Sequence, residues 1–258
     1  MMSGVLAWAG AVAIGISLGL FGSGGSILTV PVLLYLFGQD EKVAIAGSLG
    51  VVATIAAVGA IPFIFQRRVD WRNVVAFGVP GMVGTYLGAW IAGFVPGSVQ
   101  LALFAIVMLL AAYFMLRPPR LTGVETERRA VWKIAIDGLM VGILTGLVGV
   151  GGGFLIVPAL VLLGGMTIHR AVATSLVIIA LKSSTGFLKY LDVLAAQGLA
   201  IDWNVLAIVA VLGITGSLIG GRIGGFLPRE RLARYFGIFL VVMAIVILAE
   251  TAPEVFRG

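Results

Sequence analysis

The sequence predicts an all-α polytopic membrane protein made of two inverted repeats. Hydrophobic residues make up 60% of the chain and charged residues only 11%, whereas an ordinary soluble domain is about 25% charged. Two long runs, residues 73–116 and 138–168, contain no aspartate, glutamate, lysine or arginine over 44 and 31 residues. A helix crosses the hydrocarbon core of a bilayer in about 20 residues. The third observation is that the chain repeats its own motifs.

Composition also limits the function classes. The chain has no cysteine, so disulfides and thiolate metal sites are excluded, and we expect neither metal nor cofactor. The net charge of +6 would suit a nucleic-acid partner in a soluble protein, but here we expect it to orient the loops of a protein whose surroundings are the lipid bilayer. Glycine, at 37 of 258 residues, favours helices that approach closely in lipid.

The repeat is read by sliding the sequence along itself. An offset of 127 places residues 19–26 (GLFGSGGS) on 146–153 (GLVGVGGG). After an insertion of five residues the offset is 132, which places 69–71 (VDW) on 201–203 (IDW). We therefore expect one membrane domain with a first repeat at 1–117, a linker at 118–129 and a second repeat at 130–258.

Each repeat is expected to contain five helical segments. Of the ten segments in the two repeats together, about eight to ten are expected to lie in the membrane. The first two segments of each repeat are short around a glycine-rich break, which predicts a hairpin whose tip lies near the bilayer midplane. The expected ranges are 4–21, 26–37, 43–65, 72–94, 98–116, 132–148, 153–163, 169–189, 203–226 and 229–249.

The distribution of lysine and arginine predicts the orientation. If helices alternate and the segments at 132–148 and 153–163 form a hairpin, 13 basic residues lie on one side, three lie on the other, and Lys182 lies within a helix. The positive-inside rule makes the first side cytoplasmic. The linker is then cytoplasmic and the N-terminus outside, in a bacterial or archaeal inner membrane, and the two repeats are inverted relative to each other.

The two hairpin tips are the predicted binding site. A glycine-rich break before a short helix presents free N–H groups at the positive end of that helix, where anions bind. The alternative is that the glycines only permit tight helix packing, but two tips in inverted repeats favour a site for a small anion. The tip residues are Gly22, Ser23, Gly24, Gly25 and Ser26 in the first repeat and Gly149, Val150, Gly151, Gly152 and Gly153 in the second.

Side chains of the third segment of each repeat are expected to complete this site. Hydroxyl groups come from Ser48, Thr174, Ser175 and Ser183, although in membrane helices such hydroxyls also bond their own backbone. Lys182 lies about 18 Å from the helix start at Arg170, where an ammonium group is costly and functional. It either faces the substrate or extends to the outer headgroups. Its counterpart in the first repeat is Ile55, so the site is asymmetric.

The paired motifs resemble those of the sulfite exporter TauE/SafE family. The first copy reads GLFGSGGSILTVPVLLYLFG with AIAGSL, and the second reads GLVGVGGGFLIVPALVLLGG with AVATSL. The resemblance covers nearly the whole chain and implies an inner-membrane carrier that exports sulfite, sulfoacetate or other organosulfonates. Gly-Ser-Gly-Gly-Ser and Gly47-Ser48 depart from the family pattern, and Lys182 is not part of it.

The predicted function is therefore secondary transport of a small sulfur-containing anion by alternating access. An anion channel, or a carrier for another oxyanion or a carboxylate, is the alternative. An enzyme is not indicated, because the chain lacks the H-E-x-x-H motif and its single histidine, His169, is expected at a membrane edge. The coupling ion, proton or sodium, is not indicated either. Asp137 can carry a proton or pair with Lys133, which lies four residues before it on the same helical face.

Overall fold

The computed structural model describes residues 2–21, 25–116, 130–162, 166–223 and 229–255, and within these ranges it contains helices and no strand. The first repeat contains α1 (Met2–Phe21), α2 (Gly25–Pro31), η1 (Val32–Leu36), α3 (Glu41–Phe65), α4 (Trp71–Asn73), η2 (Val74–Gly78), α5 (Val79–Ala92) and α6 (Gly97–Leu116). The second contains α7 (Val131–Val148), α8 (Gly153–Leu162), α9 (Ile168–Ala196), α10 (Trp203–Ile223) and α11 (Arg229–Val255).

The polytopic fold predicted from the sequence is confirmed. Among the described residues, six helical stretches are long and apolar enough to cross a membrane, and shorter apolar helices accompany them. The helix boundaries agree with the expected ranges within a few residues, except that α9 and α11 continue six or seven residues further. Asp70 and Asp202 cap the helices that follow them: the Asp70 side chain accepts a hydrogen bond from the N–H of Asn73, and Asp202 accepts from that of Val205.

Two π-helical turns, η1 and η2, were not expected. Each adjoins a proline: Pro31 directly precedes η1, and Pro80 lies two residues after η2. Proline lacks an N–H donor and its ring crowds the carbonyl four residues earlier. For Pro80 this carbonyl belongs to Ala76 inside η2, where a wider turn relieves the clash. The η2 turn matters for function, because it carries Phe77, a buried aromatic residue of the bundle interior.

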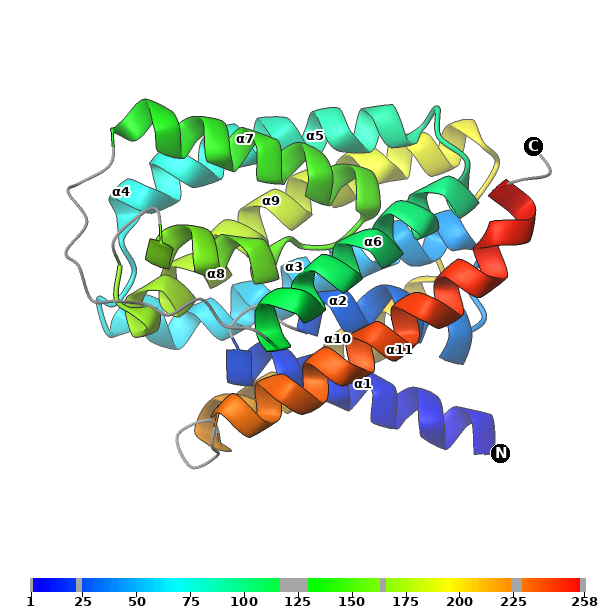
Figure 1. Cartoon of the computed structure of the whole chain (residues 1–258), viewed down its shortest axis with the longest axis horizontal. Helices are drawn as coiled ribbons and strands as arrows, with labels where there is room; N and C mark the ends of the chain where they lie inside the picture. Colours follow the sequence, from blue (N-terminus) through cyan, green and yellow to red (C-terminus); the bar gives the residue numbers. More distant parts are fainter. Residues whose placement is uncertain (1, 22–24, 117–129, 163–165, 224–228, 256–258) are drawn as a thin grey trace.

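The helices pack in pairs that follow the repeat. Helices α3 and α9, the third segments of the two repeats, pack against each other. Helix α5 packs on α7, α1 packs on α10, and α6 packs on α11 (Figure 1). The α1–α10 pair corresponds to the α7–α5 pair under the sequence offsets, and the α3–α10 contact corresponds to α9–α5.

Glycines at equivalent positions make these crossings close. A Cβ atom on Gly84 would lie 2.2 Å from the carbonyl oxygen of Leu139, and one on Gly216 would lie 2.4 Å from that of Val12. The offsets of 132 and 127 relate Gly84 to Gly216 and Val12 to Leu139. Helices in lipid associate through this kind of backbone contact, because small residues let them approach.

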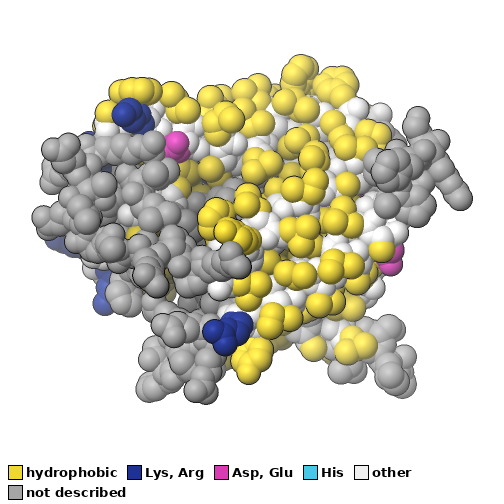
Figure 2. All heavy atoms as spheres, viewed as in Figure 1, with side chains coloured by type: hydrophobic (Ala, Val, Ile, Leu, Met, Phe, Trp, Pro, Cys, Tyr) yellow, Lys and Arg dark blue, Asp and Glu magenta, His cyan; other side chains and the backbone are white. Residues whose placement is uncertain are grey.

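Basic residues gather at one end of the bundle. Helix α4 lies at the left in Figure 1, and α7, α9 and α11 begin there, whereas α1 begins and α11 ends at the right. Arg72 lies in α4, Arg170 lies in the first turn of α9, and Arg222 lies in the last turn of α10. Between the two ends, hydrophobic side chains cover most of the described surface in the view of Figure 2.

Candidate functional site

The break between α7 and α8 is built by two glycines with a left-handed backbone. Gly149 ends α7 with φ 75° and donates its N–H to the carbonyl of Thr145 at 2.9 Å. Gly152 has φ 67° and directly precedes α8. Side chains disfavour this conformation, so glycine is required at both positions. The backbone thus turns back inside the bundle, and the first amide groups of α8 have no carbonyl of their own helix to bond.

Polar side chains from three other helices hold the end of α7. The carbonyl of Leu147 accepts hydrogen bonds from Gln100 Nε2 at 3.1 Å and from the Tyr190 hydroxyl at 3.2 Å. The Ser48 hydroxyl of α3 donates to the carbonyl of Gly149. Gln100 and Tyr190 are fully buried and were missed by the sequence analysis. The available signal was a glutamine inside the charge-free run 73–116.

Lys182 of α9 is enclosed by the bundle. Its side chain is 1% exposed, so it does not extend to the headgroups, and the interfacial alternative does not describe this structure. A Cβ atom on Gly81 of α5 would lie 2.8 Å from Lys182 Cδ, which shows that the glycine makes room for the lysine stem. Its Nζ lies 5.8 Å from the centroid of the Phe77 ring and has no hydrogen-bond partner among the described residues.

Lys182 and its neighbour Ser183 both face the second tip. Nζ of Lys182 lies 3.4 Å from where a Cβ atom on Gly152 would be, and Ser183 Oγ lies 3.0 Å from a Cβ position on Gly151. Ser183 is 1% exposed, and its Oγ also has no partner in the described part of the chain. Two unpaired buried polar groups therefore meet a backbone without side chains. Buried polar groups normally have partners, and the third such atom in the described chain is Oε1 of Gln100, whose amide nitrogen bonds the Leu147 carbonyl.

The other predicted site residues lie elsewhere or have protein partners. Thr174 accepts a hydrogen bond from the N–H of Asp70 at 3.0 Å and so links α9 to the start of α4. Ser175 donates to the carbonyl of Val172 in its own helix at 2.9 Å. Val150 and Gly153 are buried in the tip.

In the first repeat, the described tip residues pack against α1. A Cβ atom on Gly25 would lie 2.2 Å from the carbonyl oxygen of Ile14, and Ser26 is buried. Gly22, Ser23 and Gly24 lie outside the described residues. The described part of the first tip therefore contributes helix packing, and the unpaired polar groups belong to the second tip.

The chemistry of the site suits an anion and not a metal. Within the described ranges, no group of three histidine, cysteine, aspartate or glutamate side chains is placed to hold a metal ion. A lysine amine, a hydroxyl group and free helix-start amides are all hydrogen-bond donors. An ammonium in this apolar setting needs a negative partner.

Residues 7–247 match the family described as sulfite exporter TauE/SafE. The chain belongs to the TauE/SafE family. It is 33% identical over 242 residues to a "Probable membrane transporter protein" of Xylella fastidiosa strain Temecula1, with 91% of both chains covered. It is 25% identical to the "Probable membrane transporter protein YunE" of Bacillus subtilis, with 93% of this chain and 92% of that protein covered. No solved structure matches the chain.

The chain is thus a membrane transporter of the TauE/SafE family and not an enzyme. The family description names sulfite export. The names of the two relatives state membrane transport and no substrate.

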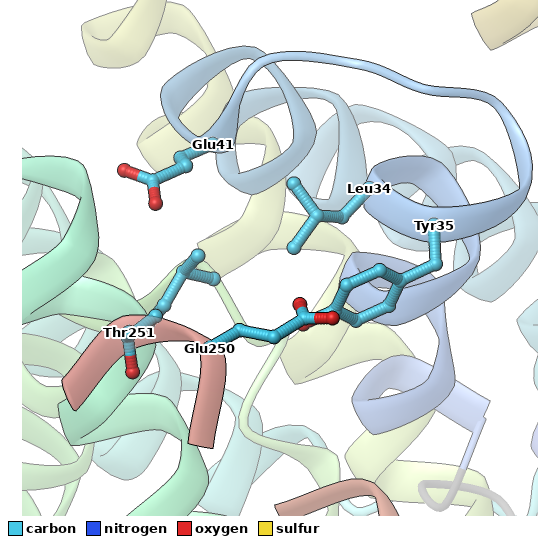
Figure 3. A pocket seen from close by; sticks show the side chains of 6 residues that line it. Leu34, Tyr35, Glu41, Glu250 and Thr251 are labelled. Carbon is cyan, nitrogen blue, oxygen red and sulfur yellow. The ribbon is translucent and has the colours of Figure 1, made fainter. Parts of the chain in front are cut away.

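A cavity elsewhere in this TauE/SafE chain is lined by carboxylates, in contrast to the amine at Lys182. It has a volume of about 260 Å³ and is lined by Leu34, Tyr35, Glu41, Leu101, Glu250 and Thr251. Figure 3 shows Glu41 and Glu250 on opposite walls, with Tyr35 beside Glu250, to which its hydroxyl donates a hydrogen bond. Two carboxylates repel an anion, so the site at Lys182 is the better candidate.

Proposed function

We propose that this TauE/SafE chain is a secondary transporter that exports small sulfur-containing anions, such as sulfite or the organosulfonate sulfoacetate. The observation that carries the proposal is the buried amine of Lys182, which faces the second tip beside Ser183 without a partner in the described chain. An anion bound there pairs with the amine and accepts hydrogen bonds from Ser183 and the amides that begin α8. The description of the family names sulfite, and this is the reason to propose a sulfur-containing anion.

The proposal includes two inverted repeats that move around this site. The equivalent glycine contacts of the α1–α10 and α5–α7 pairs support two structurally related halves. The opposite starting ends of α1 and α7 in Figure 1 support their inversion. Inverted repeats with broken helices at a central site are the basis of alternating access in many carriers. In this proposal each moving body contains helices of both repeats, α1, α3 and α10 in one and α5, α7 and α9 in the other. The two bodies rock across the α3–α9 contact, which opens the site to each side in turn.

The orientation belongs to the same proposal. The arginine-rich end is cytoplasmic, which places the linker 118–129 inside and the N-terminus outside in a bacterial or archaeal inner membrane. The chain has no cysteine, so single cysteines can report the orientation without background. A cysteine in place of Arg72 should react with an impermeant maleimide only after the cells are opened. One in place of Asp192 should react in intact cells, and the reverse pattern would contradict the orientation.

Transport itself is tested in proteoliposomes with labelled sulfite and labelled sulfoacetate. A carrier gives saturable flux and counterflow, in which unlabelled anion on one side drives labelled anion to accumulate there. An anion channel gives flux without counterflow. If neither anion moves under any ion gradient, the proposed function is wrong.

A further inference from the structure

Lys182 lies inside the bundle, where apolar groups and the tip backbone surround its amine. Its amine is 1% exposed and has neither a hydrogen-bond nor an ion-pair partner among the described residues. The nearest groups are the Phe77 ring at 5.8 Å, the backbone at Gly152, and Ser183, the next residue along α9. Burial without a partner disfavours the charged form of an amine, and an opposite charge within hydrogen-bond distance favours it.

We propose that Lys182 carries one proton with each transported anion. This inference rests on the proposed function and names its coupling ion. The neutral amine binds a proton when an anion enters, and the ammonium–anion pair fills the site. When the anion leaves on the other side, the amine releases that proton there and returns neutral. One N–H bond forms and one breaks in each cycle, so protons and charge balance without another reactant.

Other titratable groups are already engaged or lie away from the amine. The elements that pack against α9 are α3, α5, α7, α8 and η2. Lys189 of α9 pairs with Asp192 at 3.2 Å, and the Tyr190 hydroxyl bonds the carbonyl of Leu147. Among the side chains that the structure describes, the remaining charged and titratable groups on or beside these elements are Glu41 and Lys42 at the start of α3, Arg67 and Arg68 after its end, Asp70 and Arg72 beside η2, Tyr86 of α5, Lys133 and Asp137 of α7, and Arg170 at the start of α9.

Asp137 is the competing proton carrier. It precedes Gly138, where a Cβ atom would lie 2.3 Å from the carbonyl oxygen of Phe77, so α7 passes close to the layer of Lys182. Asp137 is half-buried and takes part in other interactions. The Asp137→Asn variant therefore separates the two carriers.

One proton per anion determines which force drives export. A divalent anion leaves with one net negative charge, so an inside-negative membrane potential drives it outward. A monovalent anion leaves in an electroneutral step, and an inward proton gradient opposes its export. The same site would then export dianions against their concentration gradient. The distribution of monoanions across the membrane would follow the proton gradient alone.

Isothermal titration of the purified full chain with sulfoacetate measures the protons directly. Both acidic groups of this probe stay ionised above about pH 6, so protons taken up on binding go to the protein. Titrations at one pH in buffers of different ionisation enthalpy should give one proton taken up per anion. The apparent affinity should fall about tenfold for each pH unit of increase. Binding without proton uptake would overturn the inference and leave the carrier proposal standing.

Two variants complete the test. Lys182→Arg keeps a permanent charge, so it should bind sulfoacetate with no proton uptake and with an affinity independent of pH. Asp137→Asn should take up one proton as the natural chain does. Loss of uptake in Asp137→Asn would assign the proton to Asp137 and overturn the inference. Absence of any binding of sulfoacetate or sulfite by the natural chain would overturn the proposed function together with this inference.

In proteoliposomes whose membrane potential is held at zero with potassium and valinomycin, a pH gradient alone should accumulate labelled sulfoacetate on the alkaline side. Lys182→Arg should lose this accumulation, because its guanidinium does not release a proton, whereas Asp137→Asn should keep it. Accumulation by Lys182→Arg equal to that of the natural chain would overturn the inference. This readout does not depend on affinity.

Discussion

Lys182 and Ile55 occupy equivalent positions of the two repeats, and the glycines that face them are equivalent too. A Cβ atom on Gly81 would lie 2.8 Å from Lys182 Cδ, and one on Gly213 would lie 2.2 Å from Ile55 Cδ1. Each third-segment helix thus inserts one long side chain into a slot opened by a glycine of the other repeat. The slot with isoleucine is filled by apolar packing, whereas the slot with lysine ends in an unpaired amine beside a glycine tip. One architecture therefore serves packing on one side and binding on the other.

The largest effect is expected from Lys182→Ile, which makes the second slot chemically like the first. Loss of the amine that faces the second tip should weaken sulfite or sulfoacetate binding by about 100-fold, equivalent to about 3 kcal/mol. The thermal midpoint in detergent should stay constant or rise, because an unpaired buried polar group is replaced by an apolar one. Unchanged affinity measured by isothermal titration would move the anion site away from Lys182.

A smaller effect is expected from adding a methyl group to each slot. Gly81→Ala should displace the lysine stem and reduce anion affinity about tenfold, because a site loses strength when its charged group moves by about 1 Å. Gly213→Ala should leave affinity unchanged and lower the thermal midpoint by a few degrees, since it crowds only Ile55. Equal effects of the two variants on affinity would mean that both slots belong to the binding site.

Ser183→Ala should reduce anion affinity about fivefold, the loss expected for one hydrogen bond of about 1 kcal/mol. Its thermal stability should not fall, because Ser183 Oγ has no partner in the described protein. The equivalent residue of the first repeat is Ala56, so the change again makes the repeats alike. Thr174→Val is the control: it removes the acceptor of the Asp70 N–H and should lower stability without changing affinity.

The smallest effect on binding is expected from Tyr190→Phe, which removes one of the two donors to the Leu147 carbonyl. Gln100 still bonds this carbonyl, so the tip should keep its position and anion affinity should change by less than a factor of about two. The free energy of unfolding should fall by about 1 kcal/mol, which denaturant titration can detect. A large loss of affinity would show that Tyr190 controls the tip.

The fold was predictable because its signals are local. Charge-free runs marked the spans, and the glycine-rich breaks marked the short segments α2 and α8. The repeat added the correspondence of Lys182 with Ile55 and so the asymmetry of the slots. These features depend only on the composition of short segments and on their order along the chain, so they can be predicted from the sequence.

The environment of the site was less predictable because it depends on distant residues. Gly81 makes room for a lysine about 100 positions later, and the amide of Asp70 engages Thr174 across the same separation. Gln100 and Tyr190 meet at the end of α7 through three-dimensional packing alone. To predict the π-helical turn that carries Phe77, one would have to know both the effect of Pro80 and the packing of the neighbouring helix.

The difference between Lys182 and Ile55 also bears on why the two halves share one polypeptide. Two identical single-repeat subunits, joined as a dimer, would place a lysine in both slots or in neither. A lysine in both slots would bury two unpaired amines in the bundle. A lysine in neither slot would leave the transported anion without a charged partner. Covalent fusion after duplication lets the halves diverge, so that one slot holds a lysine and the other an isoleucine.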